Sequence, residues 1–170
     1  MTVLVAYASR RGSTREIAER IGAGLRGHGL DVHLDPLLGR EEVGRYQAVV
    51  LGSAIYSSRW EREAVDFCRR NAHDLVGHAV WTFSVGWPGI AMDAASRDAT
   101  NLDEVHRLVP ERAHRYFHGA LDAGDLPLGK RLLFRMRRGR TGDLRDWAAI
   151  DAWAAEIARS LTRAASVPGT

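Results

Sequence analysis

The chain contains the turn Ser9-Arg10-Arg11-Gly12-Ser13-Thr14, which lies between the apolar run 3–7 and a helical pattern that begins at Thr14. A buried strand, a turn and the first turn of a helix together point backbone N–H groups and a positive helix end at an anion. The three hydroxyl side chains add donors, and Gly12 lets the backbone approach a ligand closely. The stretch therefore predicts a phosphate site.

Two better-known phosphate loops do not fit this turn. A Walker loop has a lysine before its final Ser or Thr, and here that position is Ser13. A dinucleotide loop needs three glycines in the turn, whereas this turn has only Gly12, and Gly22 and Gly24 fall within the helix. An ordinary capping box, with Ser13 as the cap and Glu16 reaching back, remains open on spacing alone.

The composition is typical of one compact domain. The chain has 170 residues, of which 45% are hydrophobic and 26% are charged, which allows a sizeable core. It has no apolar run long enough to cross a bilayer and no charged leader, so we expect a cytoplasmic protein. Its single cysteine, Cys68, falls on an apolar helical face and is expected to be an inert core thiol.

The basic residues are concentrated in one segment. Six of them and no acid lie between Lys130 and Arg140, and without these six the 24 basic residues fall to 18 against 21 acidic ones. A local excess of charge favours a patch that binds a partner over a protein that is basic throughout.

Apolar runs alternate with helical patterns along the chain, which predicts an α/β fold with a parallel sheet between helices. We expect a single domain over 1–163, with a basic insertion at about 124–143 and a frayed tail over 164–170. The expected strands are 2–8, 32–37, 48–51, 79–85 and 113–121, and the expected helices are 14–28, 61–71, 101–109 and 146–161.

Three loops should leave the carboxyl ends of the strands, where ligands bind in such sheets. They are 9–13, 54–60 and 86–89. The first offers an anion site, and the other two offer aromatic side chains. This arrangement suits a ligand with one phosphate and a flat apolar ring, which is the shape of flavin mononucleotide (FMN).

With these residues in view, the sequence resembles a flavodoxin. Ser9, Gly12 and Thr14 match the flavodoxin phosphate loop, in which Arg10 and Arg11 replace residues that often carry hydroxyls. Within that superfamily the chain is most similar to the menaquinone-dependent protoporphyrinogen oxidase group, through the stretches 9–18, 52–55, 83–85 and 118–121.

The resemblance implies a flavodoxin-like three-layer sandwich with a five-stranded parallel sheet in the order 2-1-3-4-5, and FMN as the cofactor. The flavin ring would lie between the loops after strands three and four, with Tyr56, Trp60 and Trp87 as candidates to stack on it; core packing at a helix start is the alternative for Trp60. The expected cofactor-binding residues are Ser9, Arg10, Arg11, Gly12, Ser13, Thr14, Ala54, Ile55, Tyr56, Ser84, Val85, Gly86 and Trp87.

Two functions follow from the resemblance. The first is an FMN-dependent oxidoreductase that dehydrogenates protoporphyrinogen or a similar substrate and passes electrons to a quinone. The second is an electron carrier between partner proteins, without a substrate of its own. The same fold with a related deazaflavin in place of FMN, or with no such ligand, remains open. We expect no dedicated catalytic side chain, and no metal site, because His114 and His118 lack a third ligand at suitable spacing.

The basic segment 130–140 has more than one possible role. Its amphipathic pattern favours contact with an anionic membrane at the inner face, through Lys130, Arg131, Arg135 and Arg138. A solvated loop or a short helix folded onto the domain, and a docking site for acidic redox partners, are the other interpretations. No nucleic acid is expected, since no recognised binding motif accompanies the arginines.

Overall fold

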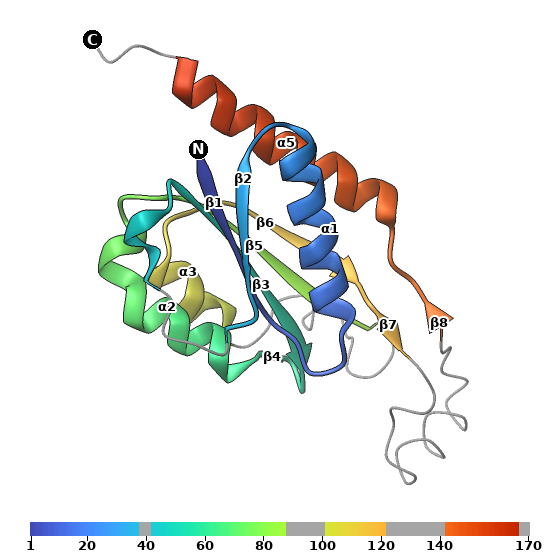
Figure 1. The fold of residues 1–170 in the computed structure, drawn as a ribbon. Helices are drawn as coiled ribbons and strands as arrows, with labels where there is room; N and C mark the ends of the chain where they lie inside the picture. The colour runs from blue at the N-terminus through green and yellow to red at the C-terminus, as the bar shows by residue number, and fades with distance from the viewer. Residues whose placement is uncertain (38–41, 88–100, 122–141, 167–170) are drawn as a thin grey trace, which may run out of the picture.

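The computed structural model describes residues 1–37, 42–87, 101–121 and 142–166. Its elements alternate between strands and helices along the chain (Figure 1). They are β1 (Thr2–Ala8), α1 (Ser13–Gly27), β2 (Asp31–Asp35), the 3-10 turn η1 (Val43–Arg45), β3 (Ala48–Tyr56), β4 (Arg59–Trp60), α2 (Arg62–Leu75), β5 (Ala79–Gly86), α3 (Leu102–Leu108), β6 (Glu111–His118), β7 (Ala120–Leu121), β8 (Gly142–Asp143) and α5 (Trp147–Ser166).

Five parallel strands form the central sheet, in the order β2-β1-β3-β5-β6. Val5 at the middle of β1 pairs with Leu34 of β2 and Val50 of β3. Since β5 and β6 are the fourth and fifth of the expected strands, the predicted order 2-1-3-4-5 is confirmed. The inner strands are apolar throughout because both of their faces are covered.

The helices cover the sheet on both sides, α1 and α5 on one face and α2 and α3 on the other (Figure 1). The alternation of side chains along β1 divides its residues between two cores. Val3, Val5 and Tyr7 pack with α1 and α5, while Leu4 and Ala6 pack with α2 and α3. The fold is therefore a three-layer α/β sandwich.

Helices α1 and α5 approach each other at a glycine. A Cβ atom added to Gly24 would lie 2.9 Å from the Cβ of Ala154, so the contact requires a residue without a side chain. Beneath α5, the Trp153 ring meets Phe83 and Phe117 edge-on, with centroids 6.0 and 5.6 Å away. This packing fixes α5 over the ends of β5 and β6.

The structure differs from the sequence prediction at 54–60, which was expected to be a loop. Strand β3 continues to Tyr56, and β4 pairs with it antiparallel as a tight hairpin. The turn residues Ser57 and Ser58 have φ values of 49° and 57°. Such hairpin turns usually carry Asn-Gly or Asp-Gly, so two serines give no signal in the sequence.

Other boundaries differ as well. The expected strand 113–121 begins earlier and is broken near Gly119 into β6 and β7, α2 continues to Leu75 instead of 71, and α5 continues to Ser166, past the expected helix end at 161. The basic segment from Lys130 to Arg140 lies outside the described residues. None of the helices described has the length and apolar character to span a membrane.

Candidate functional site

Strands β1, β3 and β5 are neighbours and parallel, so their carboxyl ends meet at one edge of the sheet. Ala8 pairs with Ser53, and Ala54 pairs with Val85, which brings the ends of the three strands into line. The described residues of the loops expected to form the site leave the sheet at this edge, and residues 88–89 of the third loop lie outside the described part of the chain (Figure 1). The topology thus brings the three groups of predicted residues together.

The turn after β1 has the geometry of an anion site. Gly12 is the N-terminal cap of α1 and has a φ of 86°, a conformation that other residues adopt at a cost. No side chain caps the helix: Ser13 Oγ accepts a hydrogen bond from the Ala120 N–H at 2.9 Å, and Glu16 Oε2 lies 2.5 Å from Arg145 Nη1. The capping box is therefore not formed, and the helix end is open to a ligand.

Ser9 supplies the observation that best fits a phosphate. Its Oγ is buried and has no hydrogen-bond partner within the described part of the chain. A buried hydroxyl without a partner loses free energy relative to one in water. Because Ser9 begins the turn that Gly12 closes, a phosphate oxygen there would restore the missing hydrogen bond. Thr14, in the first turn of α1, is 1% exposed.

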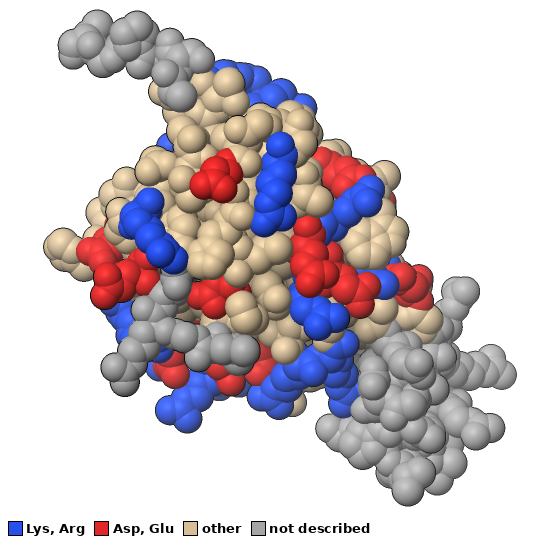
Figure 2. All heavy atoms as spheres, viewed as in Figure 1, with Lys and Arg blue, Asp and Glu red and all other residues tan. Residues whose placement is uncertain are grey.

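The side chains of Arg10 and Arg11 extend from the β1–α1 turn toward Tyr56 at the end of β3. The guanidinium carbons of Arg10 and Arg11 lie 5.4 and 5.9 Å from the centroid of the Tyr56 ring. Arg10 Nε also donates a hydrogen bond of 2.7 Å to Glu61 Oε2. Figure 2 shows Lys and Arg side chains along the lower edge of the molecule, where Figure 1 places the β1–α1 loop and the β3–β4 hairpin. The rim of the site is therefore positively charged.

The residues at the end of β3 divide between the core and the edge. Ala54 is buried, and Ile55 and Tyr56 are half-buried. Trp60 is only 3% exposed, and its Nε1 donates a hydrogen bond of 2.7 Å to Ser84 Oγ. Of the two interpretations of Trp60, the structure supports core packing, since a buried indole that already donates to Ser84 is not free to stack on a ligand.

The residues at the end of β5 have their side chains in different places. The Ser84 hydroxyl faces Trp60 and His114 in the α2–α3 side of the core, and Val85 packs in the opposite core. A Cβ on Gly86 would lie 2.4 Å from the Tyr116 hydroxyl oxygen. Trp87 is half-buried, and its Nε1 is a buried donor without an acceptor among the residues described.

A cavity of about 560 Å³ opens beside the hairpin, between Tyr56, Trp60 and the first turn of α2. The Glu61 carboxyl in its wall is 4% exposed. Burial raises the pKa of this carboxyl, and the Arg10 guanidinium opposes the rise. The cavity therefore combines a buried acid with a basic rim.

Comparison with known protein families shows to which family the chain belongs. The model of the flavodoxin domain matches residues 4–146. The chain belongs to the flavodoxin-domain family. Flavodoxin domains bind FMN, so the cofactor expected from the sequence is that of the family. A comparison with curated proteins found no significant match.

Solved structures share the flavodoxin fold at low identity. A flavodoxin from Streptococcus pneumoniae TIGR4 is 17% identical with a TM-score of 0.62, over 94% of this chain and 99% of that one. An archaeal flavodoxin is 15% identical with a TM-score of 0.57, over 95% and 99%. Rubredoxin oxygen:oxidoreductase from Desulfovibrio gigas is 13% identical with a TM-score of 0.63, and the match covers 98% of this chain but 37% of that one.

Proposed function

We propose that this flavodoxin-domain protein holds FMN at the carboxyl edge of its sheet and transfers electrons through it. One observation carries the proposal. Ser9 Oγ and Trp87 Nε1 are buried and have no hydrogen-bond partner among the residues that the structure describes, and they follow β1 and β5, strands separated only by β3 at the same edge. A ligand with a phosphate at one end and a hydrogen-bonding ring at the other would satisfy both.

Different residues would bind the phosphate and the ring of the cofactor. The Ser9 hydroxyl and the amides of the turn around Gly12 would bind the phosphate. The backbone near Ala54 and Gly86 would meet the ring, with Tyr56 and Trp87 at its sides. FMN supplies the redox chemistry when bound, and the protein supplies position, exclusion of water and hydrogen bonds.

The phosphate contact can be tested separately from the ring contact. Ser9→Ala should weaken FMN binding about 10- to 100-fold, because a hydrogen bond to a charged group contributes about 1.5–3 kcal/mol. Riboflavin has the same ring without the phosphate, so its affinity should be unchanged. Ser160→Ala on α5 is the matched control. Titration followed by flavin fluorescence gives both affinities, and equal losses for FMN and riboflavin would contradict the assignment.

The ring contact is tested with Trp87→Leu, which should weaken FMN and riboflavin alike. The matched variant Trp147→Leu changes an indole at the start of α5 and should leave both affinities unchanged. Purified protein that is colourless and binds neither flavin would overturn the proposal as a whole.

A finer proposal is that the flavoprotein oxidises a reduced porphyrinogen-like substrate with a quinone as acceptor. It rests on the sequence resemblance. One of the resembling stretches, 118–121, contacts the phosphate turn, where Ala120 N–H donates to Ser13 Oγ. The test is quinone-dependent oxidation of protoporphyrinogen by the pure protein. Reduction and reoxidation only by partner flavoproteins or other redox proteins would favour the carrier function instead.

Access to a membrane quinone would require contact with a bilayer. We infer that Lys130, Arg131, Arg135 and Arg138, which lie outside the described residues, provide it. Flotation with anionic liposomes tests this: the pair Arg135→Glu and Arg138→Glu should abolish binding. The pair Arg112→Glu and Arg115→Glu on β6 is the control, and equal effects of the two pairs would exclude a specific contact.

A further inference from the structure

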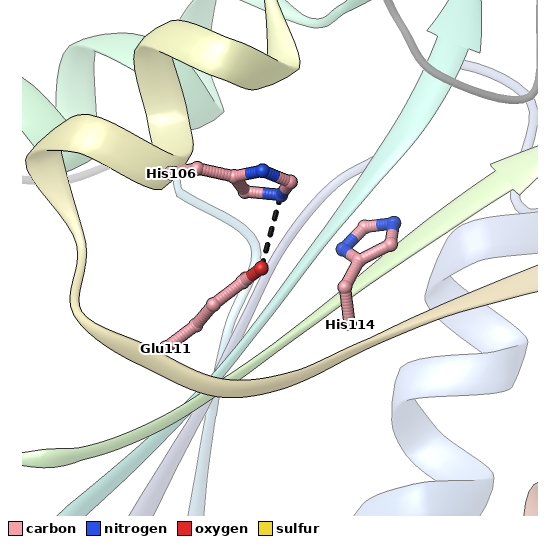
Figure 3. Close-up of side chains that lie close together, drawn as sticks. All are labelled: His106, Glu111 and His114. Atoms are coloured by element: carbon pink, nitrogen blue, oxygen red, sulfur yellow. Dashed lines mark ion pairs between the residues drawn. The ribbon is translucent and has the colours of Figure 1, made fainter.

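Three side chains that commonly bind metals converge between α3 and β6 (Figure 3). They are His106 on α3, and Glu111 and His114 on β6. One ligand atom from each lies within 4.8 Å of the others. His106 Nε2 and Glu111 Oε1 are 2.9 Å apart, and the His106 and His114 rings meet at a centroid distance of 5.7 Å. Within the described ranges no other three such residues come this close.

We propose that His106, Glu111 and His114 bind a first-row divalent transition metal, with Zn²⁺ as the preferred ion. Two imidazoles and one carboxylate are a ligand set that Zn²⁺ accepts, with a fourth position for water or another ligand. Mg²⁺ and Ca²⁺ prefer oxygen ligands throughout, so the imidazoles disfavour them.

The geometry needs only a small contraction to hold the ion. Ligand atoms around a tetrahedral Zn²⁺ lie roughly 3.3 Å apart, given bond lengths of about 2.0–2.1 Å. His106 is on the solvent side, with 40% of its side chain exposed, and can rotate toward the other two ligands. Glu111 is more enclosed, at 14%. The site is thus reached from solvent on the α3 side.

Residues of β5 already orient two of the ligands. Thr82 Oγ1 donates a hydrogen bond to Glu111 Oε2 and also contacts His114 Nδ1 at 2.7 Å. Ser84 Oγ lies 3.1 Å from His114 Nε2. Because the Thr82 proton goes to Glu111, His114 Nδ1–H donates to Thr82 Oγ1 in the metal-free network. Metal binding at Nδ1 would move the ring proton to Nε2, where Ser84 Oγ can accept it, while Thr82 still holds the second oxygen of Glu111. Such outer partners are a general feature of metal sites.

The metal site would be coupled to the hairpin beside the cofactor edge. Ser84 Oγ, which holds His114, also accepts the hydrogen bond from Trp60 Nε1. A metal that fixes the His114 ring would therefore fix Ser84 and Trp60 in turn. The proposal does not depend on FMN, because none of the three ligands belongs to the residues proposed to bind the cofactor.

Binding is tested on the full chain as purified, after removal of metals with a chelator. Equilibrium dialysis against ZnCl₂ should give one Zn²⁺ per chain. His106→Ala should lower the affinity about 100-fold or more, because loss of an outer partner alone costs 10- to 100-fold. His73→Ala removes a fully exposed histidine of α2 and should change nothing. Glu111→Gln, which keeps the shape of the side chain, should lower the affinity as His106→Ala does.

A second readout separates a built site from chance binding at surface histidines. Zn²⁺ should raise the midpoint of thermal unfolding of the wild type and of His73→Ala, but not of His106→Ala. FMN affinity should be the same in the His106→Ala and His73→Ala variants, so failure of the flavin proposal would leave this test intact. Equal losses of Zn²⁺ in the two histidine variants, or less than one Zn²⁺ per wild-type chain, would overturn the metal site and leave a hydrogen-bonded network in its place.

Discussion

Arg10 Nε lies 2.7 Å from Glu61 Oε2, an ion pair that joins the turn after β1 to the residue that precedes α2. The two partners differ in environment, since 67% of the Arg10 side chain is exposed but only 3% of the Glu61 side chain. The other carboxylate oxygen of Glu61 is buried and has no partner among the described residues. The ion pair therefore connects the β1–α1 turn to the start of α2 through a carboxylate that has only one of its two oxygens hydrogen-bonded among the described residues.

The free energy of unfolding should depend on pH through the ionisation of Glu61. Burial raises the pKa of this carboxyl above its ordinary value of 4.5, so the folded chain holds the proton more tightly than the unfolded chain. The stability that this proton contributes is complete below the unfolded pKa and is lost as pH rises through the folded pKa. Glu61→Gln should therefore gain stability relative to the wild type as the pH rises above the ordinary carboxyl pKa of 4.5.

Arg10→Gln is the companion variant for this prediction. It removes the charge that lowers the pKa of Glu61, so the loss of stability with rising pH should be larger than in the wild type. Urea unfolding at each pH measures both effects. Identical pH profiles in the wild type and both variants would contradict the role given to the pair.

Gly12→Ala should weaken FMN binding about tenfold. The added Cβ has space, with its nearest neighbour 3.9 Å away, so the effect comes from the φ of 86°, which costs about 1–2 kcal/mol for other residues. Gly29→Ala is the matched control, because Gly29 has a φ of 80° and nothing near its added Cβ, at the other end of α1. It should lower stability by a similar amount and leave FMN affinity unchanged in a fluorescence titration.

Gly24→Ala should destabilise the fold by about 1–3 kcal/mol, because its Cβ would meet Ala154 at 2.9 Å and push α1 away from α5. Gly27→Ala, in the same helix with no atom within 4 Å of its added Cβ, should be neutral or stabilise by up to about 1 kcal/mol. Denaturant unfolding of the two variants gives the comparison. A similar change in both would mean that the helices can separate at little cost.

Cys68 should be unreactive while the protein is folded. The thiol is buried, and burial raises its pKa to about 12, so almost no thiolate is present at neutral pH. A thiol reagent such as dithionitrobenzoate should label no cysteine in the native protein and one after denaturation, since the sequence has a single cysteine. Rapid labelling of the native protein would show that α2 opens.

The sheet could be predicted from sequence because its inner strands β1, β3 and β5 are apolar runs, as strands buried on both faces should be. The hairpin at Ser57 and Ser58 could not, because its turn has none of the usual residues. The environment of Trp60 could not be predicted either, because the sequence pattern of an aromatic residue after a strand is the same whether its side chain faces the core or a ligand. Its burial against Ser84 depends on a strand 24 residues later in the chain.

The residues proposed to bind a metal illustrate the same limit. The sequence places His114 and His118 four residues apart on the expected strand and shows no third ligand at suitable spacing. In the structure the His118 ring instead meets Tyr116, at 5.5 Å, and His106 reaches His114 from α3. The spacing of 106, 111 and 114 across a helix end and a strand start becomes meaningful only once α3 is known to lie against β6.

Six buried residues of helix α5 pack in the core on one face of the sheet, yet α5 is the last of the described elements to be synthesised. They are Ile150, Trp153, Ala154, Ile157, Ala158 and Leu161. A nascent chain that has left the ribosome only as far as β6 would therefore expose Phe83 and Phe117 to water on that side. This face of the sheet is therefore fully covered only after translation has passed the helix.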